Sequence, residues 1–272
     1  MSRWSAGSVQ TNGITMHYYR SGGNKPPLVL AHGLTDNGLC WKPIAQVLAE
    51  TYDCVMPDAR GHGFSSAPES GYTNADHAAD YAGLIEALGL ARPAVLGHSM
   101  GSGTTTQLAA SYPQLVRGAL LEDPPWRPRS HASGGPESVE RAEAWRADIL
   151  SKNQLTISAL LAKGRIERPG WPDAEYDGWT AAKQQVDPKA LDYARVSSMP
   201  WWEMVPQIKC PTLLITADVE KGAIVSQETA EAVAALNSRV QIAHIPGAGH
   251  SIRREQPQRY LAVVQAFLAT LY

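Results

Sequence analysis

Short apolar runs alternate with longer helical patterns along most of the chain. The runs show no alternation with polar residues, which is typical of parallel strands covered on both faces of a sheet. We expect such strands at residues 28–31, 54–56, 94–96, 116–121, 213–216 and 240–245. A hairpin precedes them, because Asn12 and Gly13 separate two strand-like runs and both residues tolerate the positive φ of a tight turn. This order of elements predicts an α/β fold with a mostly parallel sheet.

Helical patterns fill the segments between these runs. We expect helices over residues 73–89, 226–236 and 258–271. Thr73 or Asn74 can cap the first of them, Ser226 can cap the second, and an apolar stripe marks the third. Helices between the strands are what covers both faces of a parallel sheet.

The segment from residue 124 to residue 206 breaks the alternation. It shows helical patterns around residues 137–150, 155–164, 176–186 and 189–197 but no convincing strand. We therefore expect a helical cap over residues 124–206, inserted into a core made of residues 1–123 and 207–272. Six of the 8 tryptophans lie in this segment, which indicates an aromatic face above the sheet. We expect Trp126 and Trp202 to line a ligand pocket there.

Composition and charge exclude several classes of protein. The chain has 272 residues, of which 44% are hydrophobic, as in a globular domain. Its net charge is -2 and its Lys and Arg residues form no cluster, which argues against a nucleic-acid-binding protein. The 3 cysteines lie far apart, which favours buried, reduced thiols over a disulfide framework or a zinc ribbon. No apolar leader follows Met1 and no apolar run reaches membrane-spanning length, so we expect a cytoplasmic protein without a membrane partner.

A candidate nucleophile lies in the pentapeptide Gly-His-Ser-Met-Gly at residues 97–101. An apolar run precedes it and a helical pattern over residues 100–111 follows it, which is the context of a sharp strand-to-helix turn. Gly97 and Gly101 leave room for that turn, and the turn places the Ser99 hydroxyl at a helix N-terminus, where negative charge is favoured. Ser99 is therefore the expected nucleophile.

A serine hydroxyl needs a base, and the base needs an acid that orients it. We expect His250 to be the base, because it lies in a glycine-rich loop after the last apolar run. Asp218 is the expected acid, because it comes directly after the penultimate run, where a strand end holds it. Glu220, two residues further out, and Asp123, after the preceding run, remain alternatives.

Acyl chemistry also needs donors for the oxygen of the tetrahedral intermediate. The backbone N–H of Met100, directly after the nucleophile, is the first expected donor. The backbone N–H of Leu34, in the loop after the run at residues 28–31, is the second, and Gly33 lets the backbone approach closely there.

Four motifs together resemble the α/β-hydrolase superfamily. They are His32-Gly33, residues 58–65 (Asp-Ala-Arg-Gly-His-Gly-Phe-Ser), the turn at Ser99, and Gly249-His250, and the resemblance runs from about residue 12 to the last helix. It implies an eight-stranded, mostly parallel sheet with a helical cap inserted after strand six, and it implies no metal or organic cofactor. The segment after residue 216 departs from the Gly-x-x-Asp acid loop usual in the family, because the acid comes earlier and the loop is longer.

The nature of the nucleophile narrows the chemistry that this resemblance implies. Haloalkane dehalogenases and epoxide hydrolases of the superfamily use an aspartate, whereas Ser99 implies acyl transfer to water. The chain looks like the branch of carboxylesterases, acyl-homoserine lactonases and enol-lactonases. We expect a carboxylesterase for small to medium apolar esters, with a lactonase as the alternative. A carbon–carbon hydrolase and a ligand-sensing receptor are weaker alternatives, and the sequence indicates no oligomeric state.

Overall fold

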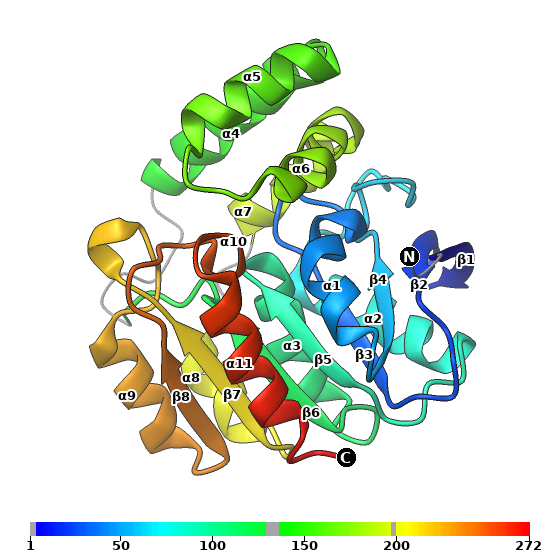
Figure 1. Cartoon of the computed structure of the whole chain (residues 1–272), viewed down its shortest axis with the longest axis vertical. Coiled ribbons are helices and arrows are strands. Elements are labelled where there is room, and N and C mark those ends of the chain that lie inside the picture. The colour runs from blue at the N-terminus through cyan, green and yellow to red at the C-terminus, as the bar shows by residue number, and fades with distance from the viewer. Residues whose placement is uncertain (1–3, 129–135, 197–199) are drawn as a thin grey trace.

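The computed structural model describes residues 4–128, 136–196 and 200–272. Eight strands form one sheet in the order β1-β2-β4-β3-β5-β6-β7-β8 (Figure 1). Their bounds are β1 Ser5–Thr11, β2 Ile14–Arg20, β3 Pro27–Ala31, β4 Asp53–Pro57, β5 Ala94–His98, β6 Gly118–Glu122, β7 Thr212–Thr216 and β8 Val240–His244. From β4 to β8 neighbouring strands run parallel, and only the first hairpin and its pairing with β4 are antiparallel. The mostly parallel eight-stranded sheet expected from the sequence is confirmed.

The hairpin at the N-terminal edge forms as its turn residues predict. Asn12 has φ 42° and Gly13 has φ 76°, so both occupy the left-handed region that a two-residue turn requires. Thr11 pairs with Ile14 directly across this turn, which fixes the register of β1 against β2.

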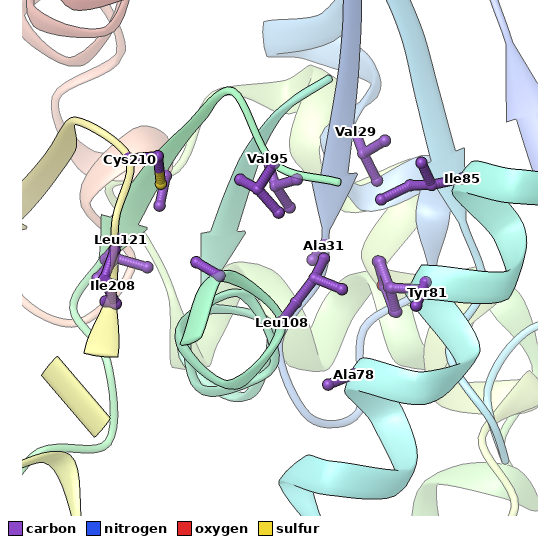
Figure 2. Packing of buried hydrophobic residues seen from close by; sticks show 14 of the residues in the cluster. Val29, Ala31, Ala78, Tyr81, Ile85, Val95, Leu108, Leu121, Ile208 and Cys210 are labelled. Atoms are coloured by element: carbon purple, nitrogen blue, oxygen red, sulfur yellow. The ribbon is translucent and has the colours of Figure 1, made fainter. Parts of the chain in front are cut away.

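Helices cover both faces of the sheet (Figure 1). Successive residues of a strand point to opposite faces, so Val29 of β3 packs in one buried cluster and Leu30 in the other. The first cluster takes side chains from α2 (Asn74–Ala87), α3 (Met100–Ser111) and α9 (Gln227–Leu236), and the second takes them from α1 (Lys42–Leu48) and α11 (Pro257–Leu268). Figure 2 shows part of the first cluster, with Tyr81 and Ile85 of α2 facing β3.

In the segment between β6 and β7, the helices α4, α5 and α6 lie beyond one end of the sheet (green in Figure 1), whereas α8 packs against α3 beside the sheet. We call residues 124–206 the cap segment. Its described residues form helices and no strand: α4 Pro136–Asn153, α5 Ile157–Glu167, α6 Asp173–Gln185, η3 Pro188–Leu191, α7 Asp192–Val196, α8 Trp201–Met204 and η4 Val205–Gln207 at its end. The expected division of the chain into a core and a cap domain stays a prediction.

Several local expectations can be compared with the structure. Thr73 caps α2 through a reciprocal pair of hydrogen bonds with Asp76, and Ser226 caps α9, both as expected. The last helix ends at Leu268, three residues before the end of its apolar stripe, although Leu271 still packs against the second cluster. Short helices such as α1 and α10 (Ile252–Glu255) have too few residues for a helical period to identify them.

Two expectations from composition concern cysteine and the membrane. All 3 cysteines, Cys40, Cys54 and Cys210, are free and buried, as expected. Within the described part of the chain, no helix combines the length and the apolar character needed to cross a bilayer. The cytoplasmic location stays a prediction.

Candidate active site

Ser99 occupies the junction between β5 and α3. Its backbone has φ 51° and ψ -114°, a conformation that L-residues avoid and that costs about 1 to 3 kcal/mol unless the surroundings impose it. The Ser99 N–H donates to the Glu122 carbonyl oxygen at 3.0 Å, which ties the turn to the neighbouring strand. The strained serine at the start of a helix is therefore held by the sheet, as the pentapeptide predicts.

The two flanking glycines make this turn possible. A Cβ on Gly97 would lie 2.2 Å from the Gly101 carbonyl oxygen, and a Cβ on Gly101 would lie 2.1 Å from the Ala31 carbonyl oxygen. Both obstacles are backbone atoms, so no side chain can rotate away to admit a methyl group. The close approach of α3 to β3 and β5 depends on these glycines.

We expect Gly101→Ala to lower the free energy of unfolding by about 3 kcal/mol, because overpacking against fixed backbone costs up to this much or more. Urea denaturation followed by circular dichroism measures the loss. Gly170→Ala is the matched control, because a Cβ there meets nothing within 4 Å. Equal stabilities of the two variants would show that the turn at Ser99 has more room than its geometry indicates.

His250 lies beside Asp123, and both residues come from loops at the same end of the sheet. The distance from His250 Nδ1 to Asp123 Oδ2 is 2.6 Å, and the aspartate is fully buried while 35% of the histidine side chain is exposed. Asp123 also accepts hydrogen bonds of 2.9 to 3.0 Å from the backbone N–H groups of Ile224 and Val225. Since a carboxylate only accepts, His250 donates through Nδ1 and keeps the Nε2 lone pair for another proton.

One cavity of about 210 Å³ connects Ser99 with this histidine. Ser99 and His250 both line it, as do Gly33 and Leu34 from the loop after β3. The structure therefore brings together the expected nucleophile and the expected base. A histidine and a serine that line one cavity are the pair of residues needed to activate a serine hydroxyl.

Asp218 does not contact His250, which corrects the geometry expected from the sequence. Its carboxylate accepts from His244 Nε2 at 3.1 Å and from the Gly247 N–H at 2.8 Å. It thus holds the loop that carries His250 instead of the imidazole itself. β6 and β7 are parallel neighbours, so Asp123 and Asp218 follow strand ends at the same edge of the sheet. Asp123 lies beside the imidazole because its backbone, with φ 39°, turns the side chain toward the loop that carries His250. Glu220 is exposed in η5 (Val219–Lys221) and belongs to neither contact.

The loop after β3 approaches Ser99 closely. A Cβ on Gly33 would lie 3.4 Å from Ser99 Cβ, and the Asp36 N–H donates to the Gly33 carbonyl oxygen at 3.1 Å, which closes a turn around Leu34. His32 supports this loop, since its Nε2 accepts from the Ala59 N–H at 2.9 Å. Leu34 lines the cavity and Met100 starts α3, where the first amides have no partner within the helix. Their roles as oxyanion donors stay predictions.

Other tryptophans than the expected ones face the cavity. Its lining contains Trp145, Trp171 and Trp179 of the cap segment. Trp126 is fully buried and stacks on Trp201, with ring centroids 6.1 Å apart, in the cluster under α3, and Trp202 packs against the same cluster. The high number of tryptophans thus indicated the segment that lines the cavity. The position of a tryptophan in the sequence does not show, however, whether it packs in the core or lines the cavity.

His98 contributes to the site in a way that the sequence did not reveal. Its Nε2 donates to the His250 carbonyl oxygen at 2.9 Å, and the two rings lie 4.8 Å apart. Burial, together with Arg253 and His250, lowers the pKa of His98 well below its ordinary value, so it is a neutral ring that positions the His250 backbone. Its place next to Ser99 in the pentapeptide was the only available signal.

A buried charge network joins the loops that carry the site. Asp36 accepts from Arg253 at 3.2 Å and from Arg254 at 3.1 Å, and Arg253 also reaches Glu122 at 3.3 Å. Burial alone would raise the pKa of Asp36, but Arg254, Lys183 and Arg253 hold it well below its ordinary value. The loop after β3 and the helix that follows His250 are thereby fixed to each other.

No metal site accompanies this arrangement in the described part of the chain, where no three His, Cys, Asp or Glu side chains gather into a group that could hold an ion.

Comparison with known proteins adds the family to this geometry. The chain is 28% identical over 275 residues to a 2-(acetamidomethylene)succinate hydrolase of Mesorhizobium japonicum, a match that covers 96% of this chain and 94% of the relative. It is 28% identical over 271 residues to an N-formylmaleamate deformylase of Pseudomonas putida, covering 97% and 96%. The crystal structure of E-2-(acetamidomethylene)succinate hydrolase superposes with a TM-score of 0.83 at 24% identity and covers 98% of this chain and 100% of that one. Residues 28–263 match the model of the alpha/beta hydrolase family. The chain therefore belongs to the alpha/beta hydrolase family and is a hydrolase.

Proposed function

We propose that the protein is a serine hydrolase that transfers the acyl group of a small carboxylic ester to water through an acyl-enzyme. Ser99 is the nucleophile, His250 the base and Asp123 the acid in this proposal. The observation that carries it is the hydrogen bond of 2.6 Å between His250 and buried Asp123, beside the cavity that Ser99 also lines. Asp123 fixes the imidazole and stabilises its charged form when the imidazole takes up a proton.

The first half of the reaction forms the acyl-enzyme. His250 Nε2 takes the proton of the Ser99 hydroxyl while Oγ bonds to the substrate carbonyl carbon. The carbonyl oxygen becomes negative and accepts from the N–H groups of Met100 and Leu34. The tetrahedral intermediate then collapses, the bond to the leaving oxygen breaks, and His250 gives that oxygen its proton.

The second half regenerates the free enzyme by the same steps. Water enters, His250 takes one of its protons, and the hydroxide bonds to the acyl carbon. The bond from that carbon to Ser99 Oγ breaks, and Ser99 receives the proton from His250. The partly exposed His250 side chain gives water a route to the acyl group.

A lactone is the second substrate class within this mechanism. It is a cyclic ester, so the same attack opens the ring and the leaving oxygen stays attached to the acyl chain. The small volume of the cavity, about 210 Å³, favours small substrates of either kind.

N-acyl amides are a further candidate, which the names of the relatives favour. Those names describe an acetamido and an N-formyl compound, in which the acyl group is carried on nitrogen. Applied to this chain, the chemistry differs only in the leaving atom, because His250 would protonate a nitrogen instead of an oxygen. A kcat/KM for an N-acetyl amide above that for the matching O-acetyl ester would select this candidate.

A fluorophosphonate probe tests the proposal directly. We expect one probe molecule per chain, attached to Ser99, as read by intact mass and by peptide mass spectrometry, because only an activated serine attacks such a probe. The wild-type protein should also release the phenol from an aryl acetate.

Heat-unfolded protein serves as the control and should stay unlabelled. No labelling of the folded protein, or labelling at another serine, would contradict the proposed nucleophile.

A further inference from the structure

The cavity above Ser99 is rich in cations. Four of its lining residues carry a positive charge, and two carry a carboxylate: Lys152, Arg168, Lys183 and Arg254 against Asp36 and Asp148. An esterase pocket for apolar substrates has no need of buried ammonium groups, and burying one costs free energy unless an anion compensates it. The question is which of these charges the protein itself neutralises.

Two of the cations are hydrogen-bonded to carboxylates. Arg254 donates to Asp36 at 3.1 Å and to Glu175 at 3.0 Å. Lys152 donates to Asp148 at 2.7 Å and lies 3.5 Å from Glu167. These contacts involve both of the acidic side chains that line the cavity, Asp36 and Asp148.

Lys183 of α6 is different, because no carboxylate is hydrogen-bonded to it in the described part of the chain. The residue is 5% exposed, and its Nζ donates to the Thr35 carbonyl oxygen at 2.7 Å and to Thr35 Oγ1 at 2.6 Å, both neutral acceptors. Asp36 Oδ1 lies 3.8 Å from Nζ, an ion pair without a hydrogen bond, while the other oxygen of that carboxylate, Oδ2, accepts from Arg253 and Arg254. An ammonium has three donors, so one donor of Lys183 makes no hydrogen bond to the described residues, and its Nζ also lies 5.4 Å from the centre of the Trp179 ring.

Arg168 is the other cation of the cavity lining to which no carboxylate is hydrogen-bonded in the described part of the chain. Its guanidinium lies 5.8 Å from the centre of the Trp171 ring and forms no ion pair with any described residue. It is exposed, so it stands at the entrance of the cavity, whereas buried Lys183 stands inside. Together they extend a positive potential from solvent toward Ser99.

We propose that this cavity binds a carboxylate of the substrate, with Lys183 as its main partner and Arg168 at the entrance. The hydrolase then acts on a small molecule that carries a free acid beside the group to be cleaved. The inference rests on the proposed function for the position of that group. Thr35, which Lys183 contacts, directly follows the oxyanion donor Leu34, so the acid and the reacting carbonyl lie only a few bonds apart in the substrate.

The ionisation of Lys183 gives this site a signature. Burial lowers the pKa of Lys183 to about 8; Asp36 and Cys40 oppose the shift, and Arg254 and Lys152 add to it. Lys183 is therefore charged below pH 8 and neutral above it. A bound anion favours the charged form, so by linkage anion binding must weaken as the pH rises through about 8.

Two matched esters test the proposal by kinetics. Monoethyl succinate carries a carboxylate, and ethyl succinamate carries a neutral amide of the same shape. We expect the wild-type protein to prefer the acid by about 10- to 100-fold in kcat/KM, the range for a hydrogen bond to a charged group. Lys183→Met should reduce this preference to less than about threefold, and Arg168→Gln, which removes an exposed charge, should reduce it by about two- to fivefold.

The quantity to compare is the ratio of kcat/KM for the acid to kcat/KM for the amide. Lys183 also holds the loop after β3, so its loss can slow the hydrolysis of both esters. Arg165→Gln is the control: it removes a cation of α5 that pairs with Asp173 and does not line the cavity, so it should leave the preference unchanged. A wild-type protein without preference for the acid, or a Lys183→Met variant that keeps it, would overturn the proposal.

Calorimetric binding to the Ser99→Ala variant separates this proposal from the proposed function. The Kd for monoethyl succinate should rise about tenfold between about pH 7 and pH 9.5, and the Kd for ethyl succinamate should stay constant. If neither ester is turned over but this binding pattern appears, the acid site stands and the ester hydrolase fails. If the two ligands bind alike at every pH, the acid site fails. This measurement and Arg168→Gln decide the matter even where Lys183→Met does not fold.

Discussion

Replacing Asp123 with asparagine is expected to lower kcat for ester hydrolysis by about 10⁴-fold with little change in KM, as for the equivalent change in a known serine protease triad. The buried carboxylate accepts from His250 Nδ1 at 2.6 Å. An asparagine amide in its place can donate to Nδ1, which moves the imidazole proton to Nε2 and removes the lone pair that Ser99 needs. Steady-state kinetics on an aryl acetate measure the loss.

Asp218→Asn is the matched control for this experiment. Asp218 also follows a strand directly, but it contacts His244 and the Gly247 amide instead of His250. We expect its loss to reduce kcat by less than about tenfold, an effect of loop position that corresponds to about 1.4 kcal/mol. If Asp218→Asn were the more damaging of the two, the triad drawn from the geometry would be wrong.

Replacing Ser99 with alanine is expected to reduce kcat by about 10⁶-fold, the size of loss known for removal of a catalytic serine. Without Oγ no acyl-enzyme forms, and only the binding cavity and the oxyanion donors remain to assist attack by water. Single-turnover assays with an aryl acetate at high protein concentration can follow so slow a reaction.

Ser251→Ala controls for the general effect of removing a hydroxyl from this cavity. Ser251 lines the same cavity next to His250 and has no role in the proposed mechanism, so its loss should change kcat by less than about fivefold. A Ser99→Ala protein that still hydrolysed the ester at a comparable rate would remove the acyl-enzyme from the mechanism.

The local pattern of the sequence was sufficient to identify the sheet, the turn at Ser99 and His250 as a residue of the same cavity. Buried parallel strands need apolar side chains on both faces, so runs such as residues 94–96 identify them with little ambiguity. The strained turn at Ser99 needs small residues at two fixed positions, and Gly97 and Gly101 supply them. His250 was identifiable because few histidines lie in a glycine-rich loop after a strand near the end of the chain.

The tertiary structure determines which carboxylate is hydrogen-bonded to His250. Asp123 and Asp218 follow adjacent parallel strands, so the sequence gives two carboxylates at one edge of the sheet. Which of them faces the imidazole depends on the left-handed backbone at Asp123 and on the amides of Ile224 and Val225, about a hundred residues away in the chain.

The tertiary structure also determines which residues line the cavity. Trp126 and Trp179 both lie in the cap segment. Trp126 is buried in the first hydrophobic cluster, however, whereas Trp179 lines the cavity. Lys183 shows no local sign of its contact with Thr35, since 148 residues separate them. Backbone conformation is determined by neighbours along the chain and can be inferred from them, whereas the contacts that tune a site form between distant segments and exist only once the chain has folded.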